Sequence, residues 1–299
     1  MTLCTVDLET PDFICWRQHA RRLLAACVPP AQVIWRTDAS AGDLFAETST
    51  ALPETSDTPL ALTLSASELG RLECASRYWP SRHQECRWSL LYRIVWRLTQ
   101  GEREALLAGD ADGAILEQRI RAVRHEAHHM HAFLRFHQQS DTSDNNIHAP
   151  EFIAWFEPRH EVLEDAARHF INRMGRHRWL IMTPDGVIAC DGETWRIERP
   201  SGERFSSSDY QALITMEDES EALWLTYYAS TFNPSRLNEK TMVRSMPSRF
   251  WRHLPERALI TGLISHARHG AQRLGQDSRL ATRRGRVITL PDSHATDER

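Results

Sequence analysis

Residues 178–199, RWLIMTPDGVIACDGETWRIER, decide the fold class of this chain. Three short segments that read as strands, at 178–182, 187–190 and 194–199, are separated by the turn sequences TPDG and DG. Asp followed by Gly is typical of tight hairpins, because both residues tolerate the backbone angles that such turns require. The stretch therefore predicts three successive antiparallel strands.

On both sides of this stretch the apolar residues change their period. Residues 132–138 and 152–158 alternate and extend the sheet, whereas helical spacing predicts the other elements. The expected helices cover 12–27, 66–78 after a Ser65 cap, 88–98, 112–131, 159–175, 219–232, 235–245 and about 255–274. Short strands are expected at 33–35 and 61–65, and loops at 37–59 and 200–218.

These elements predict an α+β fold, with a small, mainly antiparallel sheet at about 132–199 between N-terminal and C-terminal helices. We expect residues 1–275 to form a single domain and residues 276–299 a weakly ordered tail.

The composition limits the possible functions. The 299 residues carry a net charge of −4, but residues 236–299 hold 13 basic and 6 acidic side chains. The six cysteines form no C-x-x-C pair, so no iron–sulfur cluster is expected. No other cofactor is predicted. No signal peptide and no apolar run near 18 residues is visible, which predicts a reduced, cytoplasmic protein without a membrane partner.

Aromatic and basic side chains are concentrated in residues 223–256. Rings beside guanidinium groups can stack on bases and neutralise phosphates, although the same rings can also fill a core and the charges can be a solvated face. Arg236, Lys240 and Arg244 are spaced four apart on one expected helix face. The candidate nucleic-acid-binding residues are Arg135, Tyr227, Tyr228, Arg236, Lys240, Arg244, Arg249, Trp251 and Arg252.

Histidines gather at the end of the helix expected at 112–131. His125 to His129 reads HEAHH and formally fits the zinc motif H-E-x-x-H, but no distant third ligand is marked, so we expect no metal site. His128 and His131 could act as acid or base at the helix end, or simply cap it. We expect both to share one surface cleft with Arg135.

A second group of candidate catalytic side chains lies in the sequence WFEPRH. Glu157 could be a general base and His160 follows it closely, but Pro158 also favours a purely structural turn. The candidate catalytic residues are thus His128, His131, Glu157 and His160.

Three strings, HHMHAFLRF (128–136), residues 152–186 and residues 223–256, together resemble one bacterial family. Its members are DNA-metabolism proteins of undefined chemistry, encoded beside a radical S-adenosylmethionine (radical-SAM) protein and in some cases fused to a uracil-DNA-glycosylase-like domain. The resemblance covers most of residues 12–270. It implies DNA repair or DNA modification as the context, and it carries over no catalytic residue.

The resemblance and the residues together predict a DNA repair or modification accessory protein. Its expected partners are DNA, a radical-SAM protein encoded nearby, and a separate uracil-DNA-glycosylase-like protein. Two alternatives stay open: an enzyme that acts on DNA through His128, His131 and Glu157, and a protein-interaction scaffold that makes no DNA contact.

Overall fold

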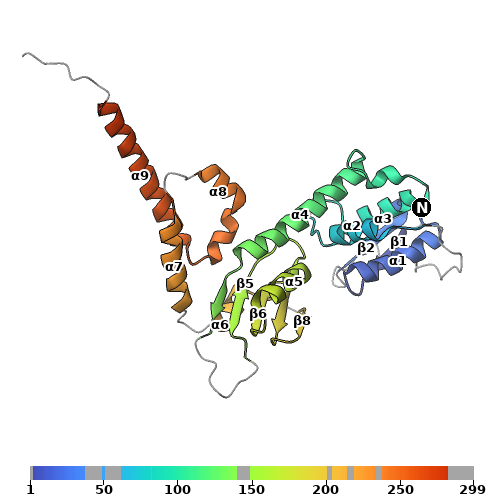
Figure 1. The fold of residues 1–299 in the computed structure, drawn as a ribbon. Helices are drawn as coiled ribbons and strands as arrows, with labels where there is room; N and C mark the ends of the chain where they lie inside the picture. The colour runs from blue at the N-terminus through green and yellow to red at the C-terminus, as the bar shows by residue number, and fades with distance from the viewer. Residues whose placement is uncertain are drawn as a thin grey trace, which may run out of the picture. The chain divides into compact units, whose positions relative to one another are not determined.

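A computed structural model describes most of the chain (Figure 1). The described residues are 3–37, 49–50, 62–81, 83–139, 149–200, 204–213, 219–233 and 238–281. The chain divides into two compact units, Met1–Met216 and Glu217–Arg299. The single domain expected over 1–275 stays a prediction.

The N-terminal unit begins with a strand that the sequence analysis missed. β1 (Leu3–Asp7) pairs in parallel with β2 (Val33–Arg36) on one side and with β3 (Ser49–Thr50) on the other. α1 (Phe13–Ala25) connects β1 to β2, lies within the helix expected at 12–27, and starts at an Asp12 cap. The signal for β1 was present, since Cys4 and Val6 are buried at alternate positions.

The prediction of a strand at 61–65 was wrong for residues 62–65, the part that the structure describes. Residues 62–65 pair with no strand, and they lead into α2 (Ala66–Ser76). The Ser65 hydroxyl accepts from Glu68 N at 3.2 Å, and the Glu68 carboxylate accepts from Ser65 N at 2.7 Å. Local capping therefore takes up the backbone groups that a strand would have offered to a neighbour.

Aromatic rings fill the core of this part of the unit. Trp16 stacks on Trp88 at 6.0 Å between centroids, and Trp35 meets the edge of Tyr92 at 5.7 Å. Trp88 and Tyr92 belong to α3 (Arg87–Thr99), which buries one apolar face against this cluster. The long helix α4 (Ala111–Phe133) follows after the short 3₁₀ helix η3 (Arg103–Leu106).

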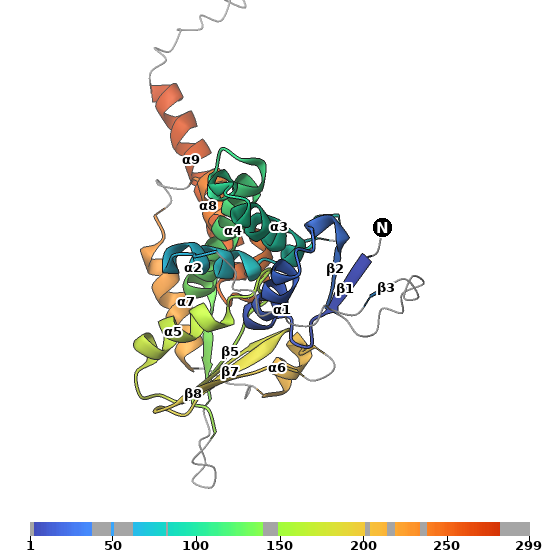
Figure 2. The same cartoon turned by 90° about the vertical axis from the view of Figure 1, so that its right-hand side faces the viewer.

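The main sheet confirms the α+β prediction. Its strand order is β4 (Phe136–Gln138), β5 (Phe152–Trp155), β6 (Trp179–Thr183), β7 (Gly186–Cys190) and β8 (Trp195–Glu198). Every neighbouring pair is antiparallel except β5 and β6, which are parallel because α5 (Leu163–Met174) crosses between them. α5 packs beside this sheet against β7 and β8 (Figure 2).

The prediction of a loop over residues 200–218 was wrong for its middle part. Residues Ser207–Leu213 form the helix α6, which packs on β5 and stacks Tyr210 on Trp155 at 6.3 Å. Its start is a reciprocal cap, because the Ser206 hydroxyl accepts from Asp209 N and the Asp209 carboxylate accepts from Ser206 N. The sequence SSSD carried that signal.

The C-terminal unit contains α7 (Glu219–Thr231), α8 (Glu239–Ser245), the 3₁₀ helix η5 (Ser248–His253) and α9 (Arg257–Ala281). Its buried residues include Phe250, Leu254 and Ile260. Asn238 caps α8, a later start than the expected 235. α9 continues past 274 into the expected tail, and the tail beyond Ala281 lies outside the described residues.

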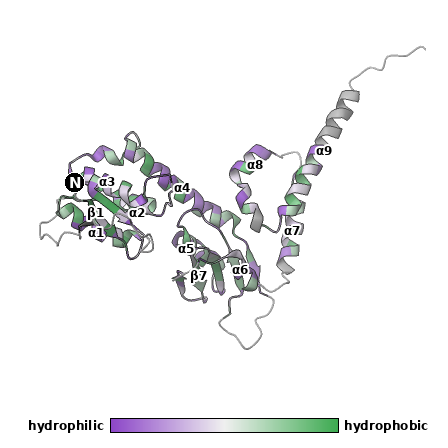
Figure 3. Cartoon of the chain, turned by 180° about the vertical axis from the view of Figure 1, so that it is seen from behind, coloured by the Kyte–Doolittle hydropathy of each residue, from purple (hydrophilic) through white to green (hydrophobic). Residues whose placement is uncertain are grey.

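Hydrophilic and hydrophobic residues are interspersed along the helices (Figure 3). Within the described ranges, no helix is both long and apolar enough to cross a membrane.

Candidate functional site

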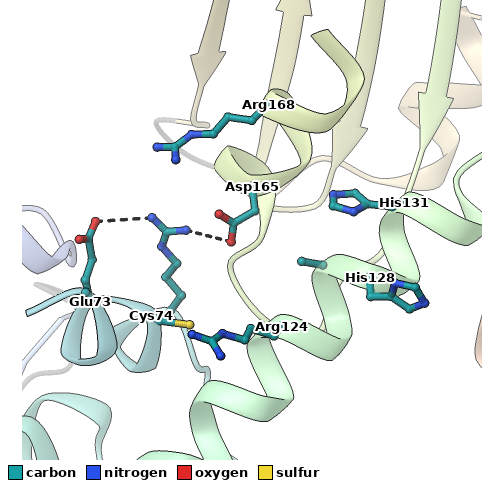
Figure 4. Close-up of a pocket in the computed structure, with 10 residues that line it drawn as sticks. Glu73, Cys74, Arg124, His128, His131, Asp165 and Arg168 are labelled. Atoms are coloured by element: carbon teal, nitrogen blue, oxygen red, sulfur yellow. Dashed lines mark ion pairs between the residues drawn. The ribbon is translucent and has the colours of Figure 1, made fainter. Parts of the chain in front are cut away.

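Three helices of the N-terminal unit enclose a polar cleft of about 480 Å³, which we call the α2–α4–α5 cleft (Figure 4). Its size lies within the range of roughly 300–1,000 Å³ that is typical of small-molecule pockets. Its lining residues are Gly70, Glu73, Cys74, Arg77, Arg124, Ala127, His128, His131, Asp165 and Arg168.

Helical spacing explains why these side chains meet. Arg124, His128 and His131 are separated by four and three residues, so they share one face of α4. Asp165 and Arg168 share a face near the start of α5 for the same reason. The cleft is thus built from three faces that are far apart in the sequence.

Arg77 connects two walls of the cleft. Its guanidinium forms ion pairs with Glu73 at 3.5 Å and with Asp165 and Glu164 at 3.0 Å each. Burial acts to lower the pKa of Arg77, but these carboxylates, Asp165 foremost, raise it overall. Arg77 is therefore permanently charged and is used to hold α2 against α5.

Cys74 is the only thiol on the lining of this cleft, and it is poorly suited to be a nucleophile. Burial raises the pKa of its thiol, although the neighbouring Arg124 acts in the opposite direction. The thiolate is the reactive form of cysteine, and a raised pKa keeps it scarce near neutral pH. The arrangement does not support nucleophilic catalysis by Cys74.

His131 and His128 differ in their surroundings. The His131 ring points toward Asp165, whereas the His128 ring points away from it (Figure 4). Burial, followed by the nearby His169, lowers the pKa of His131. A neutral imidazole at pH 7 can accept a proton, so His131 is the better placed of the two for acid–base chemistry.

The structure does not bring all four candidate catalytic residues together. Glu157 is exposed and accepts a hydrogen bond from the indole Nε1 of Trp155 at 3.2 Å. His160 accepts from the backbone N of Trp79 at 3.3 Å and packs against the Tyr78 ring. Neither Glu157 nor His160 lines the cleft, so only His128 and His131 do.

The cleft shared by His128, His131 and Arg135 was expected but is only partly present. The Arg135 guanidinium donates to the carbonyls of Ala132 at 3.0 Å and Leu134 at 3.2 Å, and it does not line the cleft. The last carbonyls of a helix lack intrahelical partners, which makes them good acceptors for a nearby arginine. Arg135 therefore serves the end of α4.

The HEAHH sequence is turned partly inward. Glu126 and His129 are buried, and Glu126 accepts a hydrogen bond from the backbone N of Arg159 at 2.8 Å. His125 is exposed, and its ring lies 4.0 Å from that of His129. No group of three potential metal ligands occurs in the part of the chain that the structure describes.

The candidate nucleic-acid-binding residues of the C-terminal unit fall into two classes. Tyr227 is 58% exposed, and Lys240 and Arg244 are exposed and form no hydrogen bond or ion pair with the described residues. Tyr228 is half-buried on α7. Trp251 is also half-buried, and its Nε1 donates to Met246 O at 3.1 Å.

The remaining candidates of this unit are less informative. The Arg249 guanidinium lies 4.1 Å from the centroid of the Phe250 ring, so it covers the small core. Arg236 and the side chain of Arg252 lie outside the described residues.

Sequence reasoning missed Glu73, Cys74, Arg77, Arg124, Asp165 and Arg168 as cleft residues. Only their three- and four-residue spacing could have marked them, and many solvated helix faces share that spacing.

A comparison with protein families matches residues 85–256 to DUF4130, a domain of unknown function. No curated protein and no solved structure matches the chain. The matched region contains α4 and α5 but not α2, so one wall of the cleft lies outside it. Because the match covers more than half of the chain, the protein belongs to the DUF4130 family.

Proposed function

We propose that this protein binds DNA and works in DNA repair or DNA modification as an accessory to a radical-SAM protein. The observation that carries the DNA-binding part is the exposure of Tyr227, Lys240 and Arg244 in the C-terminal unit. The family resemblance of residues 128–136, 152–186 and 223–256 supports the repair context.

The two cations suit phosphate contacts because no acidic side chain among the described residues neutralises them. They are four residues apart on α8, so they point to the same side of the helix. An exposed tyrosine offers a ring on which a base can stack. Glu239, the neighbouring acid, is instead paired with Arg268.

The test is DNA binding by the full chain over a range of salt concentrations. Each phosphate contact contributes roughly one unit to the slope of log affinity against log salt. Replacing Lys240 and Arg244 together by alanine should therefore weaken binding on every sequence and reduce the slope by about two units. The matched control is Thr241→Ala with Ser245→Ala, which alters the same helix without removing charge.

If the Lys240/Arg244 variant folds and keeps both affinity and salt slope, these residues do not bind DNA. The protein would then be better described as the protein-interaction scaffold.

The accessory role is tested with the radical-SAM protein encoded nearby. Co-expression followed by size-exclusion chromatography, with and without duplex DNA, should yield a complex that contains both proteins. The uracil-DNA-glycosylase-like protein is tested in the same way. Independent elution of the radical-SAM protein under both conditions would refute the accessory role and leave DNA binding intact.

The cleft favours a second candidate function, an enzyme that acts on DNA. His131 lines the cleft and its pKa is lowered, which suits a proton acceptor. Turnover of uracil-containing or otherwise damaged DNA by the purified protein alone, lost in His131→Asn, would support the enzyme. If the purified protein leaves damaged DNA unchanged, the accessory role is the better description.

A further inference from the structure

We propose that a groove between α1 and α2 binds an amphipathic anion, a small molecule with an aliphatic chain and an anionic head group. The site belongs to the N-terminal unit, and of its lining residues only Val95 lies in the region matched to DUF4130. It goes beyond the DNA-binding surface proposed for the C-terminal unit, and either proposal can fail without the other.

The groove, which we call the α1–α2 groove, has a volume of about 540 Å³. Six residues of α1 line it, together with residues 62–64, two leucines of α2 and Val95 of α3. These three helices lie together in the N-terminal unit (Figure 1). The volume falls within the range of roughly 300–1,000 Å³ that is typical of small-molecule pockets, so we infer a small ligand.

The walls of the groove favour an aliphatic ligand. Apart from Thr63, its uncharged lining residues are apolar, and the aliphatic ones are Ala20, Leu24, Leu62, Leu64, Leu69, Leu72 and Val95. Two aromatic residues, Phe13 and Trp16, also line it, but Trp16 already stacks on Phe13 at 5.4 Å and on Trp88 at 6.0 Å between centroids. Because these rings are engaged with one another, the groove offers mainly aliphatic surface to a ligand.

The groove is also elongated. Its lining residues on α1 run from Phe13 to Leu24 at helical spacing, so they share one face of the helix. At 1.5 Å per residue this face is about 16 Å long. An extended aliphatic chain fits such a shape better than a compact ring system does.

Two arginines, Arg17 and Arg21, are the only charged residues on the described lining of this groove. They are four residues apart on α1, so their Cβ atoms lie about 5–6 Å from each other on one side of the helix. Arg21 is exposed and Arg17 is half-buried. Neither guanidinium forms an ion pair with any residue that the structure describes.

The acidic residues of the neighbouring elements have other partners. α1 itself contains no acidic residue, and Asp12 before it is used as the cap of this helix. On α2, Glu68 is part of the capping box and Glu73 pairs with Arg77 at 3.5 Å. The two guanidinium groups beside the groove are thus left for an external anion, and guanidinium binds carboxylate and phosphate oxygens in charge-assisted hydrogen bonds.

Calorimetric titration of the full chain tests the site, with ligands kept below the concentrations at which they form micelles. The main probe is decanoate, and decanol is the probe with the same chain but no charge. We expect decanoate to bind more tightly than decanol. In the series hexanoate, octanoate and decanoate, the affinity should rise about fourfold for each buried CH₂ group.

Variants then assign the binding to the groove. Replacing Arg17 and Arg21 together by glutamine should weaken decanoate by about tenfold or more and leave decanol unchanged, since only the charged head group loses its partners. Arg22→Gln is the matched control, because it removes a charge from the same helix at a position that does not line the groove.

A second pair of variants tests the apolar wall. Leu69→Gln places a polar group in this wall and should weaken decanoate and decanol alike. Leu107→Gln is its control, because Leu107 is exposed and lies outside the groove. Circular dichroism, recorded with and without decanoate, checks that all variants fold.

The kind of head group is tested by comparing decanoate with decyl phosphate. Tighter binding of decanoate assigns the site to a fatty acid, and tighter binding of decyl phosphate assigns it to an alkyl phosphate. Both results support an amphipathic anion, provided that the Arg17/Arg21 variant loses the binding.

Three results would overturn the proposal. One is the absence of saturable binding of both decanoate and decyl phosphate. Another is binding that is unchanged in the Arg17/Arg21 variant or in Leu69→Gln, which would place the ligand elsewhere on the protein. The third is tighter binding of phenylbutyrate, an aromatic acid with the same number of carbons as decanoate, which would show that the groove does not select an aliphatic chain.

Discussion

The rings of His131 and His169 stack face to face, with 4.0 Å between their centroids and 12° between their planes. His131 belongs to α4 and His169 to α5, so the stack joins the two helices that form opposite parts of the cleft wall. The Nε2 atoms of both rings are buried and have no hydrogen-bond partner among the described residues. Two stacked imidazoles in such a place are stable when neutral and repel when both are charged.

This stack predicts a loss of stability in mild acid. Burial is the main cause that lowers the pKa of both rings below 6.5, with His169 adding to the effect on His131 and Arg173 to that on His169. Asp165 acts the other way on His131, and His128 acts with His169. The unfolded chain therefore binds more protons below pH 6.5.

The contribution of the two histidines is fully present above about pH 6.5 and is lost as the pH falls through their lowered pKa values. Urea unfolding from about pH 8 to pH 5 should show a falling free energy of unfolding, and His169→Gln should reduce that fall. His266→Gln, which changes an exposed histidine of α9, is the control. An identical pH profile for His169→Gln and the wild type would show that the stack does not govern the acid response.

Gly113, in the first turn of α4, should not tolerate alanine. A Cβ there would lie 1.9 Å from the backbone carbonyl oxygen of Leu107, a group that cannot rotate away. Gly113→Ala should cost about 1–3 kcal/mol of unfolding free energy. Gly70 in α2 has no atom within 4 Å of such a Cβ, so Gly70→Ala should be neutral or stabilise by up to about 1 kcal/mol. Equal melting temperatures for the two variants would contradict this.

Tyr227 and Trp251 should respond differently to truncation. Trp251 is half-buried and hydrogen-bonded to Met246 O, so Trp251→Ala should lower the melting temperature, with a cost below the about 3–5 kcal/mol of a fully buried tryptophan. Tyr227 is mostly exposed, so Tyr227→Ala should leave the melting temperature nearly unchanged. It should weaken the binding of single-stranded DNA by about 1–3 kcal/mol. Normal DNA affinity in Tyr227→Ala would remove this ring from the proposed surface.

The HEAHH sequence should not hold zinc tightly. The Glu126 carboxylate accepts from Arg159 N, and Glu126 and His129 are both buried within the fold. Only His125 of the three motif residues is exposed. Metal analysis of protein purified without chelators should give well under one zinc per chain, and His125→Ala should not change it. One tightly bound zinc that disappears in His125→Ala would prove a metal site.

Local chemistry made much of the fold predictable. Helical spacing located α1, α3, α4 and α5 to within a few residues, and turn residues located β6, β7 and β8. The Ser65 cap was also predictable, because its hydrogen bonds join residues three apart. Two shorter elements, β1 and α6, were missed, although the alternating Cys4 and Val6 indicated β1 and the capping residue Ser206 indicated α6.

The residues of the cleft could be predicted from the sequence only in part. The sequence placed His128 and His131 on one helix face, because that relation depends on the α-helical period alone. It also suggested Arg135, which follows His131 by four residues, and Glu157 and His160, whose side chains suit acid–base chemistry. None of these three lines the cleft.

The sequence by itself determined most of the helices, the hairpin strands and the basic character of the C-terminal residues, because each depends on neighbours within a few positions. Only the tertiary structure decided that Arg77 reaches Asp165, that His131 stacks on His169 and that Arg124 shares a cleft with Arg168. These contacts join residues tens of positions apart. They depend on how whole helix faces pack, and many faces with the same spacing could pack in other ways.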